Sequence, residues 1–324
     1  MDKVLYHAVS SYQLLEVMLH RMIRHPGQWA VLLLPDFIRE KYPRYRKLKK
    51  EKFFDEVYLF PYLHIPHDSE EEIKRKVKSF YEKNVPHDVR DFSKIYVAGA
   101  HFYFSLYLME KKVPFYFFED AAGMASRSQR LWENLKKEYP LHASIAGKYG
   151  LFDGRENPQV KKIICKKNAQ TIPMQDGKYL DFQVEKELEG LDRKKRKKVI
   201  RFFIRRRIWT RAKGILLTQN FCVLGAMSRQ KQIRLYENLA AGPLFHIPLI
   251  IKKHPDDPLD YRSIFPRAGV IRPVFPSELL PYVFFRKPET VYTVDSTGCE
   301  NLKDHFQIIR LGDTMKRKEE ESHA

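Results

Sequence analysis

The strongest constraint on the fold of this chain is the alternation of short β-prone runs with longer helical patterns. In the first 120 residues, the β-prone runs cover residues 3–7, 29–34, 57–60, 94–98 and 115–118. The alternation resumes after residue 213, with runs at residues 214–219, 247–252, 270–271, 290–294 and 308–311. Strands separated by helices pair in parallel through crossover connections. The sequence therefore predicts two doubly wound α/β domains.

Helical patterns fill the intervals between these runs. Ser10 and Ser11 can cap a helix whose apolar face includes Leu14 and Met18. Ser69 precedes three glutamates, which the helix dipole favours in the first turn of a helix. Further helices are expected over residues 101–111, 229–240 and 277–286.

The length of 324 residues also suggests two domains, at roughly 150 residues per domain. We expect a Rossmann-like domain over residues 1–150, a less regular connector over 151–212 and a second Rossmann-like domain over 213–314. Residues 315–324 have the composition of a solvated tail. Two Rossmann-like domains that face each other across a central cleft form the GT-B arrangement, in which the ligand lies in the cleft.

The composition argues against several classes of protein. Hydrophobic residues make up 44% of the chain, which excludes global disorder. Cys165, Cys222 and Cys299 are far apart, so neither a disulfide framework nor a cysteine zinc site is expected. The sequence begins with no secretory signal and has no apolar run of about 18 residues. We therefore expect a soluble, cytoplasmic protein.

The formal net charge of +19 is concentrated in one segment. Between Arg193 and Lys213 twelve residues are basic and none is acidic. Without these twelve, the remaining 47 basic and 40 acidic residues leave a net charge of +7. A smaller basic cluster covers residues 41–52.

Polar side chains follow four of the predicted strands, at the strand ends where open α/β sheets bind ligands. The first domain contributes Glu119 and Asp120, which precede Gly123. The second domain contributes three groups: Thr218 and Gln219; Lys252, Lys253, His254 and Pro255; and Asp295, Ser296, Thr297 and Gly298. Taken singly, each group is explained as well by a helix start or a loop. Their shared position at strand ends favours a functional site.

These residue types suit transfer from a phosphate-activated donor. A carboxylate of the first domain could take a proton from an acceptor hydroxyl, and His254, as an imidazolium, could hydrogen-bond or protonate a departing phosphate. Ser296 and Thr297 at a helix start would form an anion site. The chain contains neither a GxGxxG nor a GxxxxGKS/T loop. Asp256 and Asp257 are adjacent and do not form a DxD pair, which disfavours metal-dependent transfer.

The same residues resemble the motifs of bacterial sialyltransferases. Glu119-Asp120 before Gly123 resembles their acidic-acidic-Gly motif, although two alanines separate the acidic pair from the glycine. Lys253-His254-Pro255 resembles their His-Pro motif, and Ser296-Thr297 resembles their Ser-Ser or Ser-Thr pair. Residues 10–15, SSYQLL, further resemble the opening of glycosyltransferase family 52, the lipooligosaccharide and capsule sialyltransferases.

The resemblance implies a GT-B fold, CMP-sialic acid as the donor, a glycan or glycolipid acceptor, inversion at the anomeric carbon and no metal or other cofactor. It assigns the acceptor to the first domain and the nucleotide sugar to the second. It adds Ser11 and Gln13 to the residues expected to bind substrate.

The catalytic base is expected to be one of the two adjacent acids. Neighbouring residues at the end of a strand point to opposite sides, so only one of Glu119 and Asp120 can face the substrate. Asp120 is favoured because it has the shorter side chain, and Glu119 stays the alternative.

The basic segment has two interpretations. Ile200, Ile204 and Ile208 recur at helical spacing, which is typical of a basic amphipathic helix on an anionic membrane surface. In the alternative, the helix packs its apolar face on the protein. The basic residues expected to contact a membrane are Arg196, Lys197, Arg201 and Arg205. Such contact would make the protein peripheral on the inner face of the cell membrane.

Two other functions stay open. One is a different GT-B-type transferase that uses another activated acidic sugar or a CDP-polyol. The other is a non-catalytic basic module that binds RNA or anionic lipid, although no zinc finger, KH loop or RNP-like motif supports a nucleic-acid partner. A homodimer is compatible with the sequence.

Overall fold

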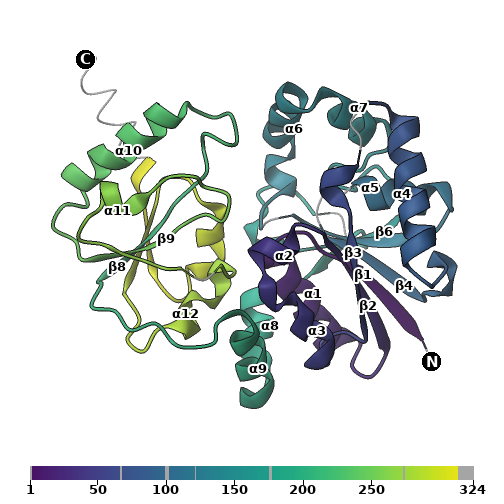
Figure 1. Ribbon diagram of the computed structural model, residues 1–324, viewed down its shortest axis with the longest axis horizontal. Helices are drawn as coiled ribbons and strands as arrows, with labels where there is room; N and C mark the ends of the chain where they lie inside the picture. The colour runs from purple at the N-terminus through teal and green to yellow at the C-terminus, as the bar shows by residue number, and fades with distance from the viewer. Residues whose placement is uncertain are drawn as a thin grey trace. The chain divides into compact units, whose positions relative to one another are not determined.

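The computed structural model describes residues 2–65, 68–98, 102–120, 122–174, 177–272 and 274–312. The chain divides into two compact units, Met1–Phe202 and Phe203–Ala324, and each unit is described by itself (Figure 1). The expected tail, residues 315–324, lies outside the described residues.

The first unit is built on a seven-stranded sheet in the order β3-β2-β1-β4-β5-β6-β7, and every pairing is parallel. The strands are β1 (Lys3–His7), β2 (Trp29–Pro35), β3 (Glu56–Phe60), β4 (Lys94–Ala98), β5 (Phe115–Phe118), β6 (Val160–Cys165) and β7 (Tyr179–Asp181). The strand order reverses between β1 and β4. In open parallel sheets, ligands bind outside the carboxyl ends of the strands at such a reversal.

Nine α-helices, besides short 3₁₀ turns, belong to the described part of this unit. They are α1 (Ser11–Arg24), α2 (Ile38–Lys41), α3 (Lys47–Lys50), α4 (Glu70–Asn84), α5 (Phe102–Glu110), α6 (Ser128–Glu138), α7 (Pro140–Lys148), α8 (Val184–Gly190) and α9 (Arg193–Phe203). Ser10, and not Ser11, is the N-cap of α1, because its hydroxyl accepts the backbone N–H of Gln13 at 3.2 Å.

Both faces of the first sheet are buried, because alternate side chains of a strand point to opposite faces. On one face Leu5 and Phe117 join a core that includes Ile73 of α4 and Phe104 of α5. On the other face aromatic side chains of β1, β4 and β5 surround His20 of α1. Figure 1 shows α4 and α5 on one side of the sheet and α1 on the other.

The prediction of a connector over residues 151–212 is wrong for most of its length. Strands β6 and β7 and helices α8 and α9 complete the first unit, and the division of the chain falls after Phe202. Two features conceal these strands in the sequence. Lys161 and Lys162 interrupt the apolar run of β6, and β7 has only three residues.

The second unit repeats the plan with five parallel strands in the order β10-β9-β8-β11-β12. They are β8 (Gly214–Leu217), β9 (Leu249–Lys252), β10 (Gly269–Val270), β11 (Thr290–Thr293) and β12 (Gln307–Arg310). The helices are α10 (Arg229–Ala241), α11 (Tyr261–Ile264) and α12 (Leu280–Val283). Tyr236 of α10 and Tyr261 of α11 pack in one core with Leu216 and Ile251 of the sheet. The helix expected over residues 277–286 is a 3₁₀ turn, Ser277–Leu279, followed by α12.

Helix α9 packs its apolar face on the first unit. Val199 and Phe202 are fully buried, and the Phe202 ring meets the Phe53 ring edge-on at 5.5 Å between centroids. The interpretation in which Ile200, Ile204 and Ile208 form one helical stripe is wrong, because α9 ends at Phe203. The contact with Phe53 also brings α9 beside the smaller basic cluster, where the Arg44 guanidinium donates to the carbonyl of Arg201.

Among the described residues, no helix combines the length and the apolar character needed to cross a lipid bilayer.

Candidate functional site

Glu119 and Asp120 follow β5 and point in different directions. The Glu119 side chain is 3% exposed, whereas Asp120 is exposed. The Glu119 carboxylate accepts the backbone N–H of Lys166 at 2.8 Å and the side-chain amide of Gln170 at 2.8 Å. Burial raises the pKa of Glu119 to about 7, although these donors oppose the shift. Glu119 is therefore an internal anchor of the loop, and Asp120 faces outward.

Asp120 is oriented by the start of α1. Gln13 donates its side-chain amide to Asp120 Oδ1 at 2.5 Å. The other end of the same amide, Gln13 Oε1, accepts the backbone N–H groups of Val9 and Ser10 at 2.8 and 3.2 Å. The amide orientation is fixed, because Oε1 must face these two donors and Nε2 must then face Asp120. The loop after β1 and the loop after β5 thus form one site at the carboxyl edge of the sheet.

The loop after Asp120 requires glycine at position 123. Gly123 has φ +78°, and a Cβ atom there would lie 2.9 Å from the carbonyl oxygen of Ala169. Arg127 holds the same turn by donating to the carbonyls of Ala122 and Gly123 at 3.0 and 3.3 Å. The glycine of the sequence motif is therefore explained by backbone geometry. Ala121 lies outside the described residues.

In the second unit, His254 is held at the carboxyl end of β9 by two hydrogen bonds. Its backbone N–H donates to Thr218 Oγ1 at 3.0 Å, and its ring Nδ1 accepts the backbone N–H of Asp256 at 3.2 Å. An Nδ1 that accepts carries no proton, so the neutral ring has its proton on Nε2. The geometry favours a neutral imidazole that donates through Nε2 over the imidazolium considered from the sequence.

Asp257 organises this part of the second unit, and the sequence analysis did not select it. Its buried carboxylate accepts Thr218 Oγ1 at 3.2 Å, Gln232 Nε2 at 3.3 Å, the N–H of Leu259 at 3.1 Å and the Tyr261 hydroxyl at 2.5 Å. The Thr218 hydroxyl donates to Asp257 and accepts from the His254 backbone. Asp257 is thereby linked to His254 through one side chain.

The loop after β11 lies close to the loop after β8. The Gln219 side-chain amide donates to the carbonyl of Asp295 at 3.1 Å. The backbone N–H of Ser296 donates to Thr293 Oγ1 at 2.8 Å, which opens a 3₁₀ helix, Thr297–Leu302. A Cβ atom at Gly298 would lie 2.7 Å from Ser277 Oγ, so the loop packs closely there. The Thr297 side chain lies outside what the structure describes.

The other predicted site residues have simpler positions. Lys252 ends β9 with its Nζ 4.8 Å from the centroid of the Phe275 ring, and Lys253 is half-buried beside it. Pro255 is exposed, and Ser11 is the half-buried first residue of α1.

The structure thus joins the predicted residues into one group per unit. Gln13 meets Asp120 in the first unit, and Thr218 meets His254 in the second. Sequence reasoning missed the residues that hold these groups in place, namely Lys166, Gln170, Arg127, Gln232 and Asp257. The position of Asp257, three residues after His254, was the one available signal.

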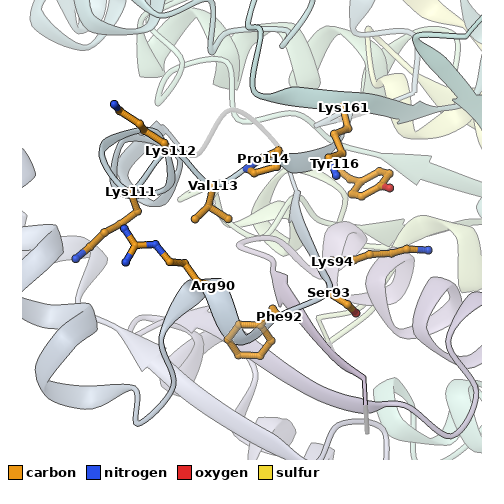
Figure 2. A pocket seen from close by; sticks show the side chains of 10 residues that line it. All are labelled: Arg90, Phe92, Ser93, Lys94, Lys111, Lys112, Val113, Pro114, Tyr116 and Lys161. Atoms are coloured by element: carbon orange, nitrogen blue, oxygen red, sulfur yellow. The ribbon is translucent and has the colours of Figure 1, made fainter.

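A cavity of about 300 Å³ lies at the opposite edge of the first sheet. Figure 2 shows Arg90 and Lys111 on one side of it, Lys94 and Tyr116 on the other, and Val113 between them. The cavity lies where β4 and β5 begin, whereas Glu119 and Asp120 follow the end of β5. It is therefore separate from the candidate site.

Within the described ranges, no group of three or more His, Cys, Asp or Glu side chains could hold a metal ion. The metal independence expected from the sequence stays a prediction.

No protein family model and no curated protein matches the chain. Solved structures do match it at low identity. The glycotransferase of kitacinnamycin aligns with a TM-score of 0.52 and 13% identity, over 95% of this chain and 80% of that one. Medicago truncatula UGT71G1 complexed with UDP-glucose aligns with a TM-score of 0.54 and 11% identity, over 95% of this chain and 79% of that one. Methanocaldococcus jannaschii UDP-GlcNAc 2-epimerase, in complex with UDP-GlcNAc and UDP, aligns with a TM-score of 0.51 and 11% identity, over 93% of this chain and 81% of that one.

These alignments and the two parallel sheets establish that the chain has a GT-B fold with two Rossmann-like domains, which confirms the predicted fold class. At such identities they bear on the fold alone, since the matched proteins include a glycotransferase and an epimerase.

Proposed function

We propose that the protein is a glycosyltransferase that moves a sugar from a nucleotide donor to a glycan hydroxyl with inversion. The observation that carries the proposal is the pair of groups at the carboxyl edges of the two sheets. One presents an outward carboxylate, Asp120, held by Gln13. The other presents the His254 ring beside the loop that contains Ser296. Together they supply a base for the acceptor and donors for a phosphate.

In this mechanism Asp120 acts as the general base. Its carboxylate takes the proton of the acceptor hydroxyl as the oxygen attacks the anomeric carbon, and the bond from that carbon to the phosphate oxygen breaks. Desolvation raises the pKa of Asp120, and the hydrogen bond from Gln13 opposes this rise, which favours the ionised form that a base needs before the attack. Glu119 is the weaker candidate because its buried carboxylate already accepts from Lys166 and Gln170.

His254 and the loop after β11 stabilise the leaving phosphate. With Nδ1 accepting from Asp256, the ring carries its proton on Nε2, and an Nε2–H can donate to a phosphate oxygen. Ser296 and the backbone N–H groups of the 3₁₀ turn add further donors. Lys252 and Lys253 add positive charge near neutral pH, although burial lowers the pKa of Lys252 to about 8.

For the donor, we propose CMP-sialic acid, with a surface glycan or glycolipid as the acceptor. The support is the motif resemblance of Glu119-Asp120, His254-Pro255 and Ser296-Thr297 to bacterial sialyltransferases, in particular those of glycosyltransferase family 52. The nucleotides bound in the matched solved structures are uridine nucleotides, so UDP is the comparison that matters most. A CDP-polyol or another activated acidic sugar is the second candidate donor.

A panel of nucleotides tests the donor class on the intact chain. CMP, CDP, UMP and UDP are compared by the shift that each causes in the thermal unfolding midpoint. A ligand at 100 times its Kd stabilises the native state by about 2.7 kcal/mol, which such a shift detects easily. A shift with CMP and none with the uridine nucleotides supports the proposed donor. Shifts with UDP alone would assign the protein to another donor, and no shift with any nucleotide would contradict the function.

A further inference from the structure

Two large aromatic side chains of the second unit are exposed next to each other. Trp209 and Phe285 are each 67% exposed. The segments that carry them are joined by a parallel β-bridge between Ile208 and Phe284, in which the Ile208 N–H donates to the carbonyl of Val283 at 2.7 Å. Phe284 is buried and Ile208 is half-buried, and successive residues of an extended segment point to opposite sides, so the next residue on each segment lies on the exposed side. Trp209 and Phe285 therefore form one exposed aromatic pair.

Arginines surround this pair on the same two segments. Arg211 lies 5.2 Å from the centroid of the Trp209 ring. Four further exposed arginines lie on these segments: Arg205, Arg206 and Arg207 before Trp209, and Arg286 after Phe285. Among the described residues, none of these five arginines forms an ion pair with an acidic side chain. The surface thus combines exposed aromatic rings with uncompensated positive charge.

We propose that this surface, defined by Trp209, Phe285 and the five arginines, binds an anionic membrane surface. Tryptophan is enriched at the headgroup level of bilayers, where one part of its ring is apolar and another donates a hydrogen bond. Basic side chains beside it are attracted to anionic lipid headgroups over about one Debye length. Helix α9 is less suited to this role, because the apolar face that it would have to insert is buried against Phe53.

Two components of binding follow, and they are separable. The arginines supply an attraction that requires anionic lipid and weakens with salt. The aromatic pair supplies a component that requires a lipid interior and persists at higher salt. The proposal is independent of the transferase function, because no residue of the surface belongs to the candidate site.

The experiment measures binding of the full chain to vesicles by co-sedimentation. Vesicles of phosphatidylcholine alone are compared with vesicles that also contain phosphatidylglycerol. W209S/F285S is matched with F245S, which removes another exposed ring of the same unit, 51% exposed and with Arg267 close to it. R205Q/R206Q/R207Q is matched with K94Q/K112Q/K161Q, which removes three charges at the cavity of Figure 2.

We expect tight binding only when phosphatidylglycerol is present. R205Q/R206Q/R207Q should weaken it on the order of 100-fold, from the contribution of each basic residue near a charged surface. W209S/F285S should weaken binding at least 10-fold, and the binding that remains should be more sensitive to salt because it depends on the arginines alone. The F245S and K94Q/K112Q/K161Q variants should bind nearly as the unmodified chain does. Trp emission should shift to shorter wavelength on binding, and the shift should be lost in W209F.

Three results would overturn the proposal. The first is an equal loss of binding in the variants of the proposed surface and in their control variants, which would show that binding does not depend on this surface. The second is binding that does not depend on phosphatidylglycerol. The third is absence of vesicle binding, and salt-sensitive RNA binding that requires the same arginines would then assign the surface to RNA.

Discussion

Gln13 combines two tasks in one side chain. Its Oε1 completes the cap of α1, and its Nε2 holds the outward carboxylate of Asp120. A buried or half-buried amide with both ends bonded has one orientation, so the cap determines where the donor points. At the residue scale, the position of the proposed base therefore depends on a helix cap from another part of the chain.

Replacing Gln13 by alanine should lower kcat more than it changes KM for the donor. Asp120 would lose the donor that positions it and favours its ionised form, so we expect a fall of about 10- to 100-fold. The acidic limb of the kcat–pH profile should move to higher pH, because the pKa of Asp120 rises without Gln13. Arg24→Ala is the control, because Arg24 lies at the far end of the same helix, where it pairs with Glu187. An unchanged pH profile in Gln13→Ala would contradict the positioning role.

Glu119 makes the stability of the first unit depend on pH. Burial raises its pKa in the folded protein to about 7, above the ordinary value of 4.5. Between these values the folded state keeps a proton that the unfolded state releases, so stability is fully present below pH 4.5 and is lost as pH rises toward 7. The loss should approach roughly 3 kcal/mol. Urea unfolding of Glu119→Gln should show a weaker pH dependence over this range, and an identical dependence would contradict the assignment.

The split between Glu119 and Asp120 follows from the sequence, but their partners do not. Alternation at the end of a strand predicts that the two carboxylates point apart, and they do. The contact between Gln13 and Asp120 joins residues 107 positions apart. No local pattern reports such a contact, because it depends on which strands become neighbours.

At the scale of elements, the loop from β5 to α6 is shaped by one close approach of two backbones. Gly123 faces the carbonyl of Ala169 at a distance that leaves no room for a side chain. Gly27 also has a positive φ, of +82°, but a Cβ atom there would have open space around it. A side chain at Gly27 would therefore cause only backbone strain, whereas a side chain at Gly123 would cause backbone strain and a steric clash.

Gly123→Ala should destabilise the protein more than Gly27→Ala does. Both variants incur the cost of a left-handed conformation, about 1 kcal/mol, and Gly123→Ala adds a clash with Ala169. Because the loop also carries Asp120, Gly123→Ala should lower the transfer rate as well. Chemical unfolding and initial rates provide the comparison. Equal stabilities and full activity in both variants would show that the loop does not need this approach.

Asp257 should be the most sensitive polar position of the second unit. Asp257→Asn turns an amide N–H₂ toward groups that are themselves donors, at a buried site where four donors now meet. We expect a loss of about 2–4 kcal/mol in the free energy of unfolding. Asp256→Asn, one residue away and exposed, should cost little. Similar costs for the two variants would remove Asp257 from its organising role.

The strand pattern was predictable where strands are apolar and bounded by clear turns. All five expected strands of each half form, within a few residues of their predicted ends. The sequence failed where the signal was weak, as in β6 with its two lysines and β7 with its three residues. It also failed for residues 193–207, where helical spacing continues past the true end of α9. Periodicity alone does not locate the end of this helix, because the isoleucine spacing continues beyond Phe203.

At the scale of the whole molecule, the two units repeat one plan. Each places its strand-order reversal next to its first strand, and each collects polar residues at the carboxyl edge of its sheet. The division of labour in the proposed reaction follows this plan, with the acceptor base on the first unit and the phosphate donors on the second. The proposal requires that Asp120 of the first unit and His254 of the second act in the same reaction, one on the acceptor and the other on the nucleotide sugar.

The most direct test of this account is transfer of the donor sugar to glycan acceptors by the intact chain and two of its variants. We expect transfer from CMP-sialic acid that inverts the anomeric centre. Asp120→Asn should abolish transfer while CMP still raises the unfolding midpoint, and His254→Ala should lower kcat by about 10²- to 10⁴-fold. Inverting transfer from a uridine donor instead would keep the transferase and contradict the proposed donor. Full activity in both variants, or no transfer from any nucleotide donor, would contradict the central claim.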